Sequence, residues 1–291
     1  MKGSAFVGKL YEWHRNGKLK SFKEVDDKRR HIKTVKLDND GNIIFLMEKG
    51  KVKVDKGWVK VEISEMQERF LKQQYELRDM IRTEDVFDIT TLKLVAGVDL
   101  AYWKDDTDNE QAVCCIVVID YKTHNVVEKK YFFGEIDIPY MPGFLAFREL
   151  PLVLKTAELL ENTPDIYMFD GNGYLHPRHM GIATHASFYL NKPTIGVAKT
   201  YFRVDKKTDY TEPGKTAGSF TDIIINEEVY GRALRTHTDV KPVFVSVGNN
   251  ISLDTATEIT MSLVEKESHI PIPTRLADLE THTMRKMILN G

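Results

Sequence analysis

The sequence has few cysteines. Its 291 residues include only two, Cys114 and Cys115, which are adjacent in the apolar stretch AVCCIVVI. Neighbouring cysteines in such a stretch indicate a buried strand and exclude a disulfide framework. This cysteine usage is typical of a reducing compartment.

Long apolar runs are missing as well. No stretch reaches the about 18 residues that a membrane-spanning helix needs. The first residues, MKGSAFVGKLYEW, lack the apolar core of a signal peptide. The sequence also contains no internal repeat and no low-complexity segment. We therefore expect a cytoplasmic protein.

The whole chain has little net charge, but one segment has a clear excess of positive charge. The formal net charge is −2, yet residues 1–37 carry 11 Lys and Arg against 4 Asp and Glu, and the rest of the chain carries 30 against 39. A basic segment can contact nucleic acid through its phosphates, whereas many charged segments are only solvated surface. The sequence leaves both readings open.

Length and composition predict one main domain with an appendage. A hydrophobic content of 42% over 291 residues is enough for a sizeable core. Residues 31–63 alternate apolar and charged side chains between the turn signals NDGN, KG and DKG, which predicts short antiparallel strands. We expect a basic, β-rich appendage of unknown role over residues 1–63 and the main domain over 64–291.

The main domain starts with a helix pattern and continues with strand patterns. Residues 64–83 open on Ser64, with Gln67 three positions later in a capping-box arrangement, and then run as a helix. Strand patterns follow at 92–103, 111–121 and 125–136. A tight polar turn joins the last two, so we expect an antiparallel meander.

Beyond residue 143 helix and strand patterns alternate, which predicts parallel pairing. The expected elements are a helix at 143–162, a strand at 165–170, a helix at 178–191, a strand at 193–200, a hairpin near 220–236, a strand at 242–248 and helices near 253–268 and 274–289. Three antiparallel strands followed by two α/β units is the order of a ribonuclease H-like sheet. We predict this α/β fold, although other α+β proteins share the order.

Two acids stand out within the apolar strands. Asp99 lies in the middle of VAGVDLAY, where an unpaired buried carboxylate would cost several kcal/mol. It is either a hydrogen-bonded structural acid or part of a site. Asp170 ends the apolar strand DIYMFD at the carboxyl edge, where α/β sites form. Because acids on adjacent strands repel each other, a divalent cation with oxygen ligands is the expected counter-ion.

Two further residues are candidates because prolines flank them. Glu149 precedes Leu150 and Pro151, which predicts a helix start or kink that aims its side chain. The alternative is a surface acid paired with Arg148 or Lys155. A second candidate, Tyr140, lies in PYMPG between two prolines, which predicts a rigid arm for stacking or wedging. The alternative is a tyrosine packed on the core.

Six ordered motifs resemble the endonuclease V family, nucleases that nick nucleic acid at deaminated adenine. The motifs are VAGVDLAY, PYMPGFLAFRELP, DGNGYLHPRHMGIATH, PTIGVAKT, GRALRT and KPVFVSVG. The resemblance runs from about 64 to 288 and leaves residues 1–63 outside it. It implies a ribonuclease H-like fold and hydrolysis of the second phosphodiester bond on the 3′ side of inosine, leaving a 3′ hydroxyl and a 5′ phosphate.

The resemblance also implies roles for single residues. The family's three metal-binding acids correspond to Asp99, Glu149 and Asp170, with Mg²⁺ as the expected ion and Mn²⁺ as the alternative. Two positions beside the scissile phosphate, which complete the expected catalytic set, correspond to His176 and Lys199. The alternatives are a histidine that only bonds a backbone carbonyl in its loop and a lysine that is plain solvated charge. The strand-separating wedge corresponds to Pro139, Tyr140, Met141 and Pro142, where methionine replaces a more usual β-branched residue.

Nucleic-acid contacts are expected from two further sets of residues. These are Gly171, Asn172 and Gly173 in the DGNG turn, and Arg232 and Arg235 in GRALRT. The alternative for the two arginines is a surface salt bridge with Glu227 or Glu228. A nearby histidine, His185 in GIATHASFYL, is expected only to pack its helix.

One position departs from the family pattern. Where many members have SVGH, this chain reads SVGN, which places Asn249 at a histidine expected to assist the metal or the water. Asparagine can coordinate or hydrogen-bond but cannot shuttle a proton near neutral pH. Because metal-assisted hydrolysis does not require a histidine base, we expect activity with a shifted pH or metal preference.

The expected mechanism extrudes inosine from the stack and holds it near the DGNG turn while the wedge fills the gap. A metal-activated water attacks in line, and Lys199 stabilises the charged phosphorane. A backbone N–H in the pocket would select the carbonyl at position 6 of hypoxanthine over the amine of adenine. We expect a monomer that acts in DNA repair, with no membrane partner. The alternatives are inosine-specific RNA cleavage, inosine binding without cleavage, and a nuclease indifferent to inosine.

Overall fold

The computed structural model describes residues 8–13, 19–25, 31–37, 43–48, 51–53, 58–59, 62–205 and 207–290. The chain divides into two compact units, residues 1–72 and 73–291. No helix in the described part of the chain combines the length and the apolar character needed to cross a membrane.

The first unit contains a six-stranded sheet whose strands follow one another in chain order. The strands are β1 (Gly8–Trp13), β2 (Leu19–Val25), β3 (His31–Leu37), β4 (Ile43–Glu48), β5 (Lys51–Lys53) and β6 (Trp58–Val59). Each pairs antiparallel with the next. The short antiparallel strands predicted from residue 31 onward are therefore confirmed, and β1 and β2 extend the sheet into the basic segment.

The first helix, α1, covers Glu62–Arg78 rather than the predicted 64–83. Ser64 lies inside its first turn and not at its N-cap. The helix ends early because the chain tightens into a turn, in which the N–H of Met80 donates to Leu77 and that of Ile81 to Arg78.

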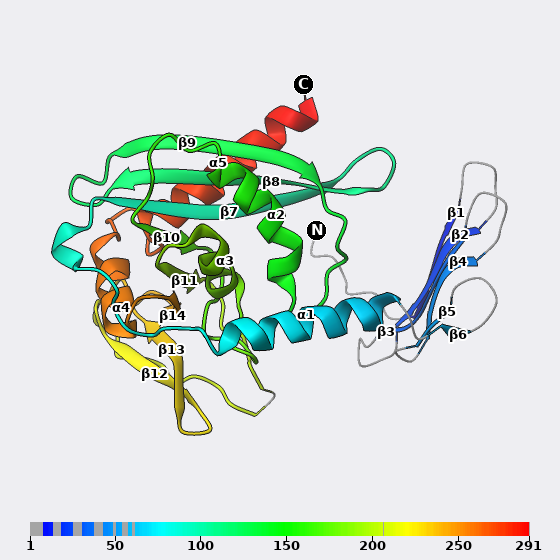
Figure 1. Cartoon of the computed structure of the whole chain (residues 1–291), viewed down its shortest axis with the longest axis horizontal. Coiled ribbons are helices and arrows are strands. Elements are labelled where there is room, and N and C mark those ends of the chain that lie inside the picture. Colours follow the sequence, from blue (N-terminus) through cyan, green and yellow to red (C-terminus); the bar gives the residue numbers. More distant parts are fainter. Residues whose placement is uncertain are drawn as a thin grey trace. The chain divides into compact units, whose positions relative to one another are not determined.

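The second unit is built on an eight-stranded mixed sheet in the order β12-β13-β14-β11-β10-β7-β8-β9 (Figure 1). The strands are β7 (Leu94–Lys104), β8 (Glu110–Asp120), β9 (Val126–Glu135), β10 (Ile166–Phe169), β11 (Thr194–Ala198), β12 (Phe220–Ile225), β13 (Glu228–Leu234) and β14 (Val243–Asn249). The helices of this unit are the 3₁₀ turn η1 (Ile89–Thr91), α2 (Leu145–Ala157), α3 (Ile182–Leu190), α4 (Leu253–Ser262) and α5 (Ile272–Asn290).

Strand directions confirm the predicted fold. β7, β8 and β9 form the antiparallel meander, and β10 pairs parallel with both β7 and β11. The segment β9-β8-β7-β10-β11 is the ribonuclease H-like part of the sheet. β14 then pairs antiparallel with β11, so the amino end of β14 lies beside the carboxyl end of β11.

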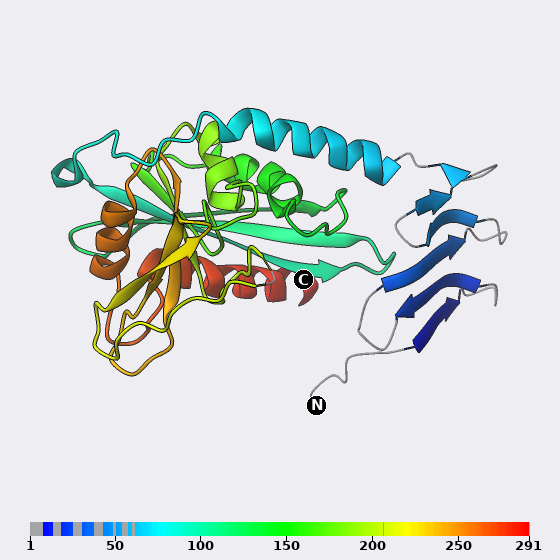
Figure 2. The same cartoon turned by 90° about the horizontal axis from the view of Figure 1, so that it is seen from below.

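Helices cover both faces of this sheet (Figure 1, Figure 2). On one face Ala96 and Val98 of β7 pack with residues of α2 and α3. On the other face Val95 packs with residues of α4 and α5. Because successive side chains of a strand point to opposite faces, the nearly unbroken apolar run of β7 fills both cores. The adjacent cysteines, Cys114 and Cys115, are buried and free in β8, as predicted.

Helix α2 corrects one prediction. Pro151 lies inside the helix, and Leu150 keeps its place in it instead of breaking the helix. Pro151 has no N–H to donate to the preceding turn, but the other helical bonds hold the segment together. Glu149 therefore lies within the helix and not at its start, and the alternative, a kink, stays a prediction.

His185 packs α3, as predicted from the sequence. Its side chain is 0% exposed, and its ring meets that of Phe147 edge-on with 4.6 Å between centroids. Neither ring nitrogen has a hydrogen-bond partner among the described residues. Burial lowers the pKa of His185 from 6.5 to about 4.

Replacing this histidine by phenylalanine should flatten the pH dependence of stability. As pH falls from 6.5 to about 4, His185 binds a proton in the unfolded chain but stays neutral in the folded protein. The free energy of unfolding therefore decreases over this range. His185→Phe removes this loss, worth up to about 3 kcal/mol. Urea unfolding of the parent and the variant at pH 7.5 and 4.5 measures this loss of the free energy of unfolding. A variant with the parental pH profile would contradict the assignment.

Candidate active site at the carboxyl edge of the sheet

The carboxyl edge of the central strands brings together two of the predicted acids. Phe169 of β10 is in register with Val98 of β7, so Asp170 and Asp99 follow side by side on adjacent parallel strands. The N–H of Asp170 donates to the Val98 carbonyl at 3.2 Å. Burial and then the charge of Asp170 raise the pKa of Asp99 to about 7. The two carboxylates therefore favour a positively charged neighbour.

The third predicted acid reaches the same place from helix α2. Glu149 is 8% exposed and accepts a hydrogen bond from the Tyr102 hydroxyl. Burial raises its pKa to about 7; the hydrogen bond from Tyr102 opposes this shift, while the charges of Asp99 and Asp170 add to it. The alternative of a surface acid is wrong, because this side chain faces the interior. The three acids thus share one electrostatic environment.

Lys199 lies at the same edge, immediately after β11. Its Nζ atom is 2.6 Å from Oδ2 of Asp170 and 2.6 Å from Oδ2 of Asp278. Burial lowers the pKa of Lys199, but the hydrogen bonds to the two carboxylates outweigh it and raise that pKa overall. The ammonium group is therefore charged and fixed beside the acids.

Three polar residues of α5 also reach this edge and were absent from the predicted set. Asp278 binds Lys199, and Thr281 donates from Oγ1 to Oδ2 of Asp99 at 3.0 Å. Nε2 of His282 lies 3.2 Å from Oδ1 of Asp278. Their spacing of i, i+3 and i+4 puts them on one helix face, which was the available sequence signal.

The donor set of this edge fits a hard divalent cation. Carboxylate oxygens are the ligands that Mg²⁺ and Mn²⁺ prefer. Among the described residues, however, no three His, Cys, Asp or Glu side chains form a ready-made metal cage. The acids therefore suit an ion that takes its other ligands from water and substrate phosphates, as Mg²⁺ commonly does.

The proline-flanked loop before α2 presents a tyrosine to solvent. Tyr140 is 66% exposed, whereas Met141 is 6% exposed and packs inward. The alternative of a core tyrosine is therefore wrong. Pro139 and Pro142 are exposed on either side. The predicted wedge thus consists of one protruding ring held by a buried neighbour.

A single carbonyl anchors this loop. Gly143 has a φ of +81°, which favours glycine, and its carbonyl oxygen accepts three hydrogen bonds. The donors are Nε2 of Gln74 at 3.1 Å, Nε2 of His176 at 3.1 Å and a guanidinium nitrogen of Arg178 at 2.6 Å. The stiffness expected from the prolines therefore has a second source, which the sequence did not reveal.

His176 acts within this anchor. Its Nδ1 accepts from the N–H groups of Arg178 and Met180, both at 3.2 Å, so Nε2 carries the proton that is donated to Gly143. Burial lowers the pKa of His176 to about 3, and the charge of Arg178 adds to the shift. The ring is neutral and positions the loop. Its contact with a scissile phosphate stays a prediction.

A pocket of about 150 Å³ lies between this loop and the DGNG turn. Its lining includes Tyr140, Gly171, Asn172, His176 and Phe202. The turn is pressed closely onto the sheet behind it. A Cβ atom on Gly173 would lie 2.2 Å from the carbonyl oxygen of Val247. Glycine is required at 173 for this close packing.

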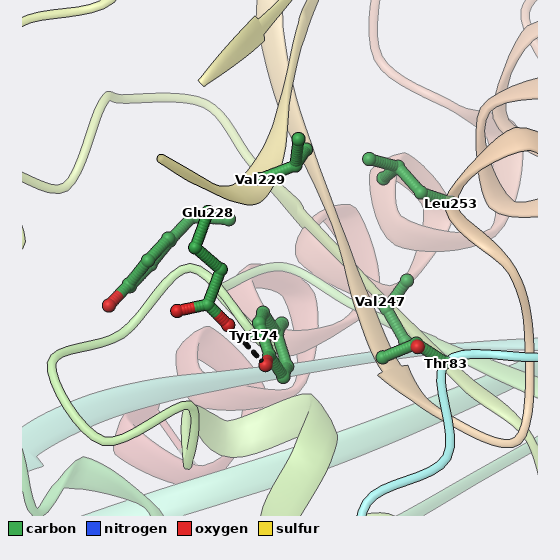
Figure 3. Close-up of a pocket in the computed structure, with 7 residues that line it drawn as sticks. Thr83, Tyr174, Glu228, Val229, Val247 and Leu253 are labelled. Atoms are coloured by element: carbon green, nitrogen blue, oxygen red, sulfur yellow. Dashed lines mark hydrogen bonds between the residues drawn. The ribbon is translucent and has the colours of Figure 1, made fainter. Parts of the chain in front are cut away.

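Tyr174, the residue after the DGNG turn, lines a second hollow of about 320 Å³ and is held there by hydrogen-bond and ring contacts (Figure 3). The Tyr174 hydroxyl donates to Oε1 of Glu228 at 2.6 Å. The Tyr174 ring stacks on His179 with 3.8 Å between centroids. Thr83 and Val247 line the same hollow, and none of the three predicted acids does. These contacts support the DGNG turn without joining the acidic site.

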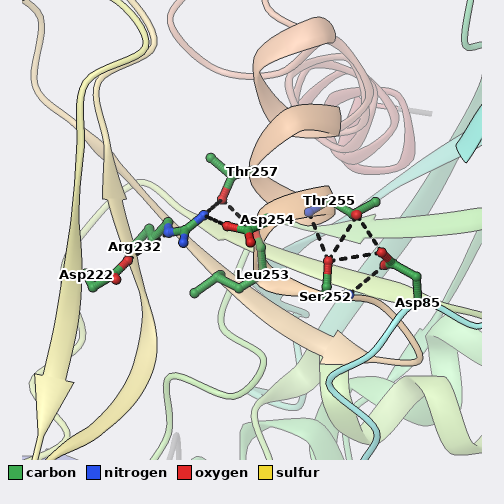
Figure 4. A network of polar contacts seen from close by, with 8 residues as sticks. All are labelled: Asp85, Asp222, Arg232, Ser252, Leu253, Asp254, Thr255 and Thr257. Carbon is green, nitrogen blue, oxygen red and sulfur yellow. Dashed lines mark hydrogen bonds and ion pairs between the residues drawn. The ribbon is translucent and has the colours of Figure 1, made fainter.

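Arg232 is held by acids other than those predicted. Its Nε lies 2.7 Å from Oδ1 of Asp222 and one terminal nitrogen lies 2.6 Å from Oδ1 of Asp254 (Figure 4). The alternative pairing with Glu227 or Glu228 is therefore wrong, because β12 and the start of α4 face Arg232. Contact of Arg232 with a phosphate stays a prediction.

Arg235 serves the interior of the protein. It is 5% exposed, and its guanidinium donates to the carbonyl oxygens of Gly214 at 2.6 Å and Pro213 at 3.1 Å, and to that of Val240. Glu212 completes its set of partners. The alternative of a surface salt bridge is therefore wrong for Arg235 as well. Its predicted phosphate contact would require these bonds to break.

Asn249 lies away from the acids, which corrects its predicted role. It ends β14 and pairs with Thr194 at the amino end of β11, whereas Asp170 lies at the carboxyl edge. It is 4% exposed, and its Oδ1 accepts from the N–H groups of Arg82 at 2.8 Å and Asn250 at 3.0 Å. Because β14 runs antiparallel to β11, its last residue lies at the opposite end of these strands from the acids.

Comparison with known proteins agrees with this architecture. The sequence profile of Endonuclease V matches residues 75–279. Endonuclease V of Bacillus thuringiensis is 59% identical over 224 residues, which cover 77% of this chain and 94% of that protein. The crystal structure of Endonuclease V from Bacillus subtilis has a TM-score of 0.74 at 53% identity, covering 77% of this chain and 94% of that chain.

A more distant relative has been solved with nucleic acid. Ciona intestinalis Endonuclease V, in complex with a 24mer DNA containing an inosine followed by a ribo-adenosine, has a TM-score of 0.69 at 32% identity. The match covers 77% of this chain and 99% of that chain. The profile match over residues 75–279 contains all eight strands of the second sheet, the three predicted acids and the loop that carries Tyr140. The chain therefore belongs to the endonuclease V family, a family of nucleases.

Proposed function

We propose that this endonuclease recognises inosine in nucleic acid and hydrolyses the second phosphodiester bond on its 3′ side, leaving a 3′ hydroxyl and a 5′ phosphate. One observation carries the proposal. Asp99 and Asp170 lie on adjacent strands at one sheet edge beside Lys199, and Glu149 is near enough for their charges to raise its pKa. The pocket lined by Tyr140 begins at the next residue, Gly171. Asp170 and Gly171 are adjacent, so the acids and the pocket are continuous.

The acids have the role of metal ligands in this mechanism. The family depends on a metal ion, and Mg²⁺, with Mn²⁺ as the alternative, suits oxygen donors. Bound there, the ion would neutralise phosphate charge and activate a water molecule. Asp99, Glu149 and Asp170 hold and orient it. Lys199 carries a fixed positive charge at the same edge, where the phosphate gains negative charge during attack.

The pocket and the wedge have the role of recognising the base. Tyr140 takes the place of the extruded nucleotide in the stack, because it is exposed and its loop is anchored through Gly143. The backbone at Gly171 and Asn172 borders the pocket. An N–H group there would donate a hydrogen bond to the carbonyl oxygen at position 6 of hypoxanthine and would find no acceptor in the amine of adenine.

DNA repair is the role that we assign to this activity. Deamination of adenine produces hypoxanthine, the base of inosine, and the Ciona intestinalis relative is seen with inosine-containing DNA. The basic segment at residues 1–37 would add affinity for phosphates. The protein acts as a monomer in this proposal.

A nicking assay tests the function. Matched strands with inosine or adenosine at one position, as DNA and as RNA, single- and double-stranded, are incubated with Mg²⁺ or Mn²⁺. We expect cleavage of the inosine DNA one nucleotide beyond the base, and none without metal. Equal cleavage of adenosine strands would mean a nuclease indifferent to inosine. Tight inosine binding with no product would mean a reader, and preference for the RNA strand would move the activity to RNA.

A further inference from the structure

A second opening borders the acidic edge and has no part in the mechanism above. It is a cleft of about 530 Å³, within the range of roughly 300 to 1,000 Å³ that small-ligand sites occupy. Lys199 lines it, and the ammonium group of this lysine is 2.6 Å from Asp170. The cleft therefore begins at the place where the scissile phosphate would bind.

The chain after β11 separates this cleft from the base pocket. Tyr201 and Arg203 line the cleft, whereas Phe202, between them, lines the base pocket together with Tyr140. A strand with its base in the pocket and a phosphate at Lys199 would continue into the cleft. The nucleotide that would lie in the cleft is the first one on the 3′ side of the cut.

The inner wall of the cleft is aromatic. The rings of Tyr201, Tyr210 and Phe244 lie against one another, with centroid distances of 5.3 Å, 5.4 Å and 4.9 Å between the three pairs. All three residues line the cleft. Aromatic walls hold bases and sugars of single strands with little regard to sequence, which suits a nuclease that selects only the inosine.

The rim of the cleft carries an available cation. Lys241 is exposed just before β14, and no acid in the described part of the chain lies within ion-pair distance of it. The two acids of the cleft have partners, since Asp209 pairs with Arg203 and Glu212 with Arg235. The charge of Lys241 is therefore left to a ligand, and a phosphate is the group that fits.

We infer that this cleft binds the first nucleotide on the 3′ side of the scissile phosphate, with its base or sugar against the aromatic wall and its 3′ phosphate on Lys241. The inference rests on the proposed function and extends it, because it adds a binding site for the part of the strand on the 3′ side of the cut.

Two lengths of substrate and one variant test the inference. The long inosine strand has four nucleotides after the cut, and the short one ends at the 3′ hydroxyl of the first, so it lacks the phosphate assigned to Lys241. For the parent enzyme we expect KM to rise about five-fold on the short strand. Lys241→Ala should raise KM about as much on the long strand and should show no further rise on the short one. On the long strand it should also reduce the slope of log KM against log salt by about 0.7.

The control is Lys122→Ala, which removes an exposed lysine from the β8–β9 turn. This turn lies beside the amino end of β7, at the opposite end of the strands from the acids. It should keep the parental KM on both strands. If the losses from Lys241→Ala and from shortening add independently, or if the parent cuts both lengths with one KM, the cleft assignment is overturned while the proposed function stands. If the parent cuts no inosine strand of either length, the proposed function fails and the cleft assignment fails with it.

Discussion

Asp170→Asn should lower inosine-dependent nicking by at least about 10³-fold while the protein stays folded. The change keeps the shape of the side chain and removes one of the charges that meet at the sheet edge. In the native protein burial and the charge of Asp170 raise the pKa of Asp99 to about 7, so these neighbours repel each other. Lys199 keeps Asp278 as a partner after the substitution. The free energy of unfolding should therefore change by no more than about 1 kcal/mol.

The measurement pairs single-turnover nicking in Mg²⁺ with urea unfolding of the same preparation. Glu258→Gln is the matched control, because it removes an exposed carboxylate from α4 and should leave both readings unchanged. Parental nicking by Asp170→Asn would end the assignment of the acids. A variant that is inactive because it is unfolded would instead give Asp170 a structural role.

Gly97→Ala should destabilise the protein by more than about 3 kcal/mol and should weaken nicking through α5. A Cβ atom at position 97 would lie 2.0 Å from both the carbonyl carbon and the carbonyl oxygen of Pro273. Neither is the end of a flexible side chain, so the start of α5 must move away from β7. That helix carries Asp278 and Thr281, which bind Lys199 and Asp99.

Gly134→Ala is the matched control for this effect. Gly134 also lies in a strand, and its added Cβ would meet only side-chain atoms at ordinary contact distance, Cδ2 of Leu152 at 3.4 Å and Cε1 of Phe132 at 3.9 Å. It should cost less than about 1 kcal/mol. Thermal unfolding of the two variants side by side gives the comparison, and equal melting temperatures would show that the contact between β7 and α5 relaxes without cost.

The sheet could be predicted because its signals are local. The meander from β7 to β9 follows from alternating apolar segments and polar turns, and the change to alternating helices and strands predicts β10 and β11. The ends of the elements were predicted less accurately than their order. α1 runs over Glu62–Arg78 instead of 64–83, since capping patterns do not decide where tertiary contacts stop a helix.

The corrections share one cause, which is strand direction and packing over long distances in the chain. Asn249 falls at the far edge because β14 runs antiparallel to β11, and no residue near Asn249 encodes that direction. Arg235 is enclosed by Glu212 and three carbonyl oxygens that its own motif does not contain. Pro151 stays within α2, so the helix start that its local preference predicted near Glu149 is wrong.

The sequence by itself determined the order of the elements, the apolar strand that contains Asp99, the apolar strand that Asp170 follows, and the proline-flanked tyrosine, because each depends on neighbouring residues. Only the tertiary structure decided that Glu149 is buried beside those acids, that α5 adds Asp278 and Thr281, and that the Gly143 carbonyl fixes the loop. These features depend on contacts between segments that are distant in the chain, and such contacts exist only after the sheet has assembled and the helices have packed on it.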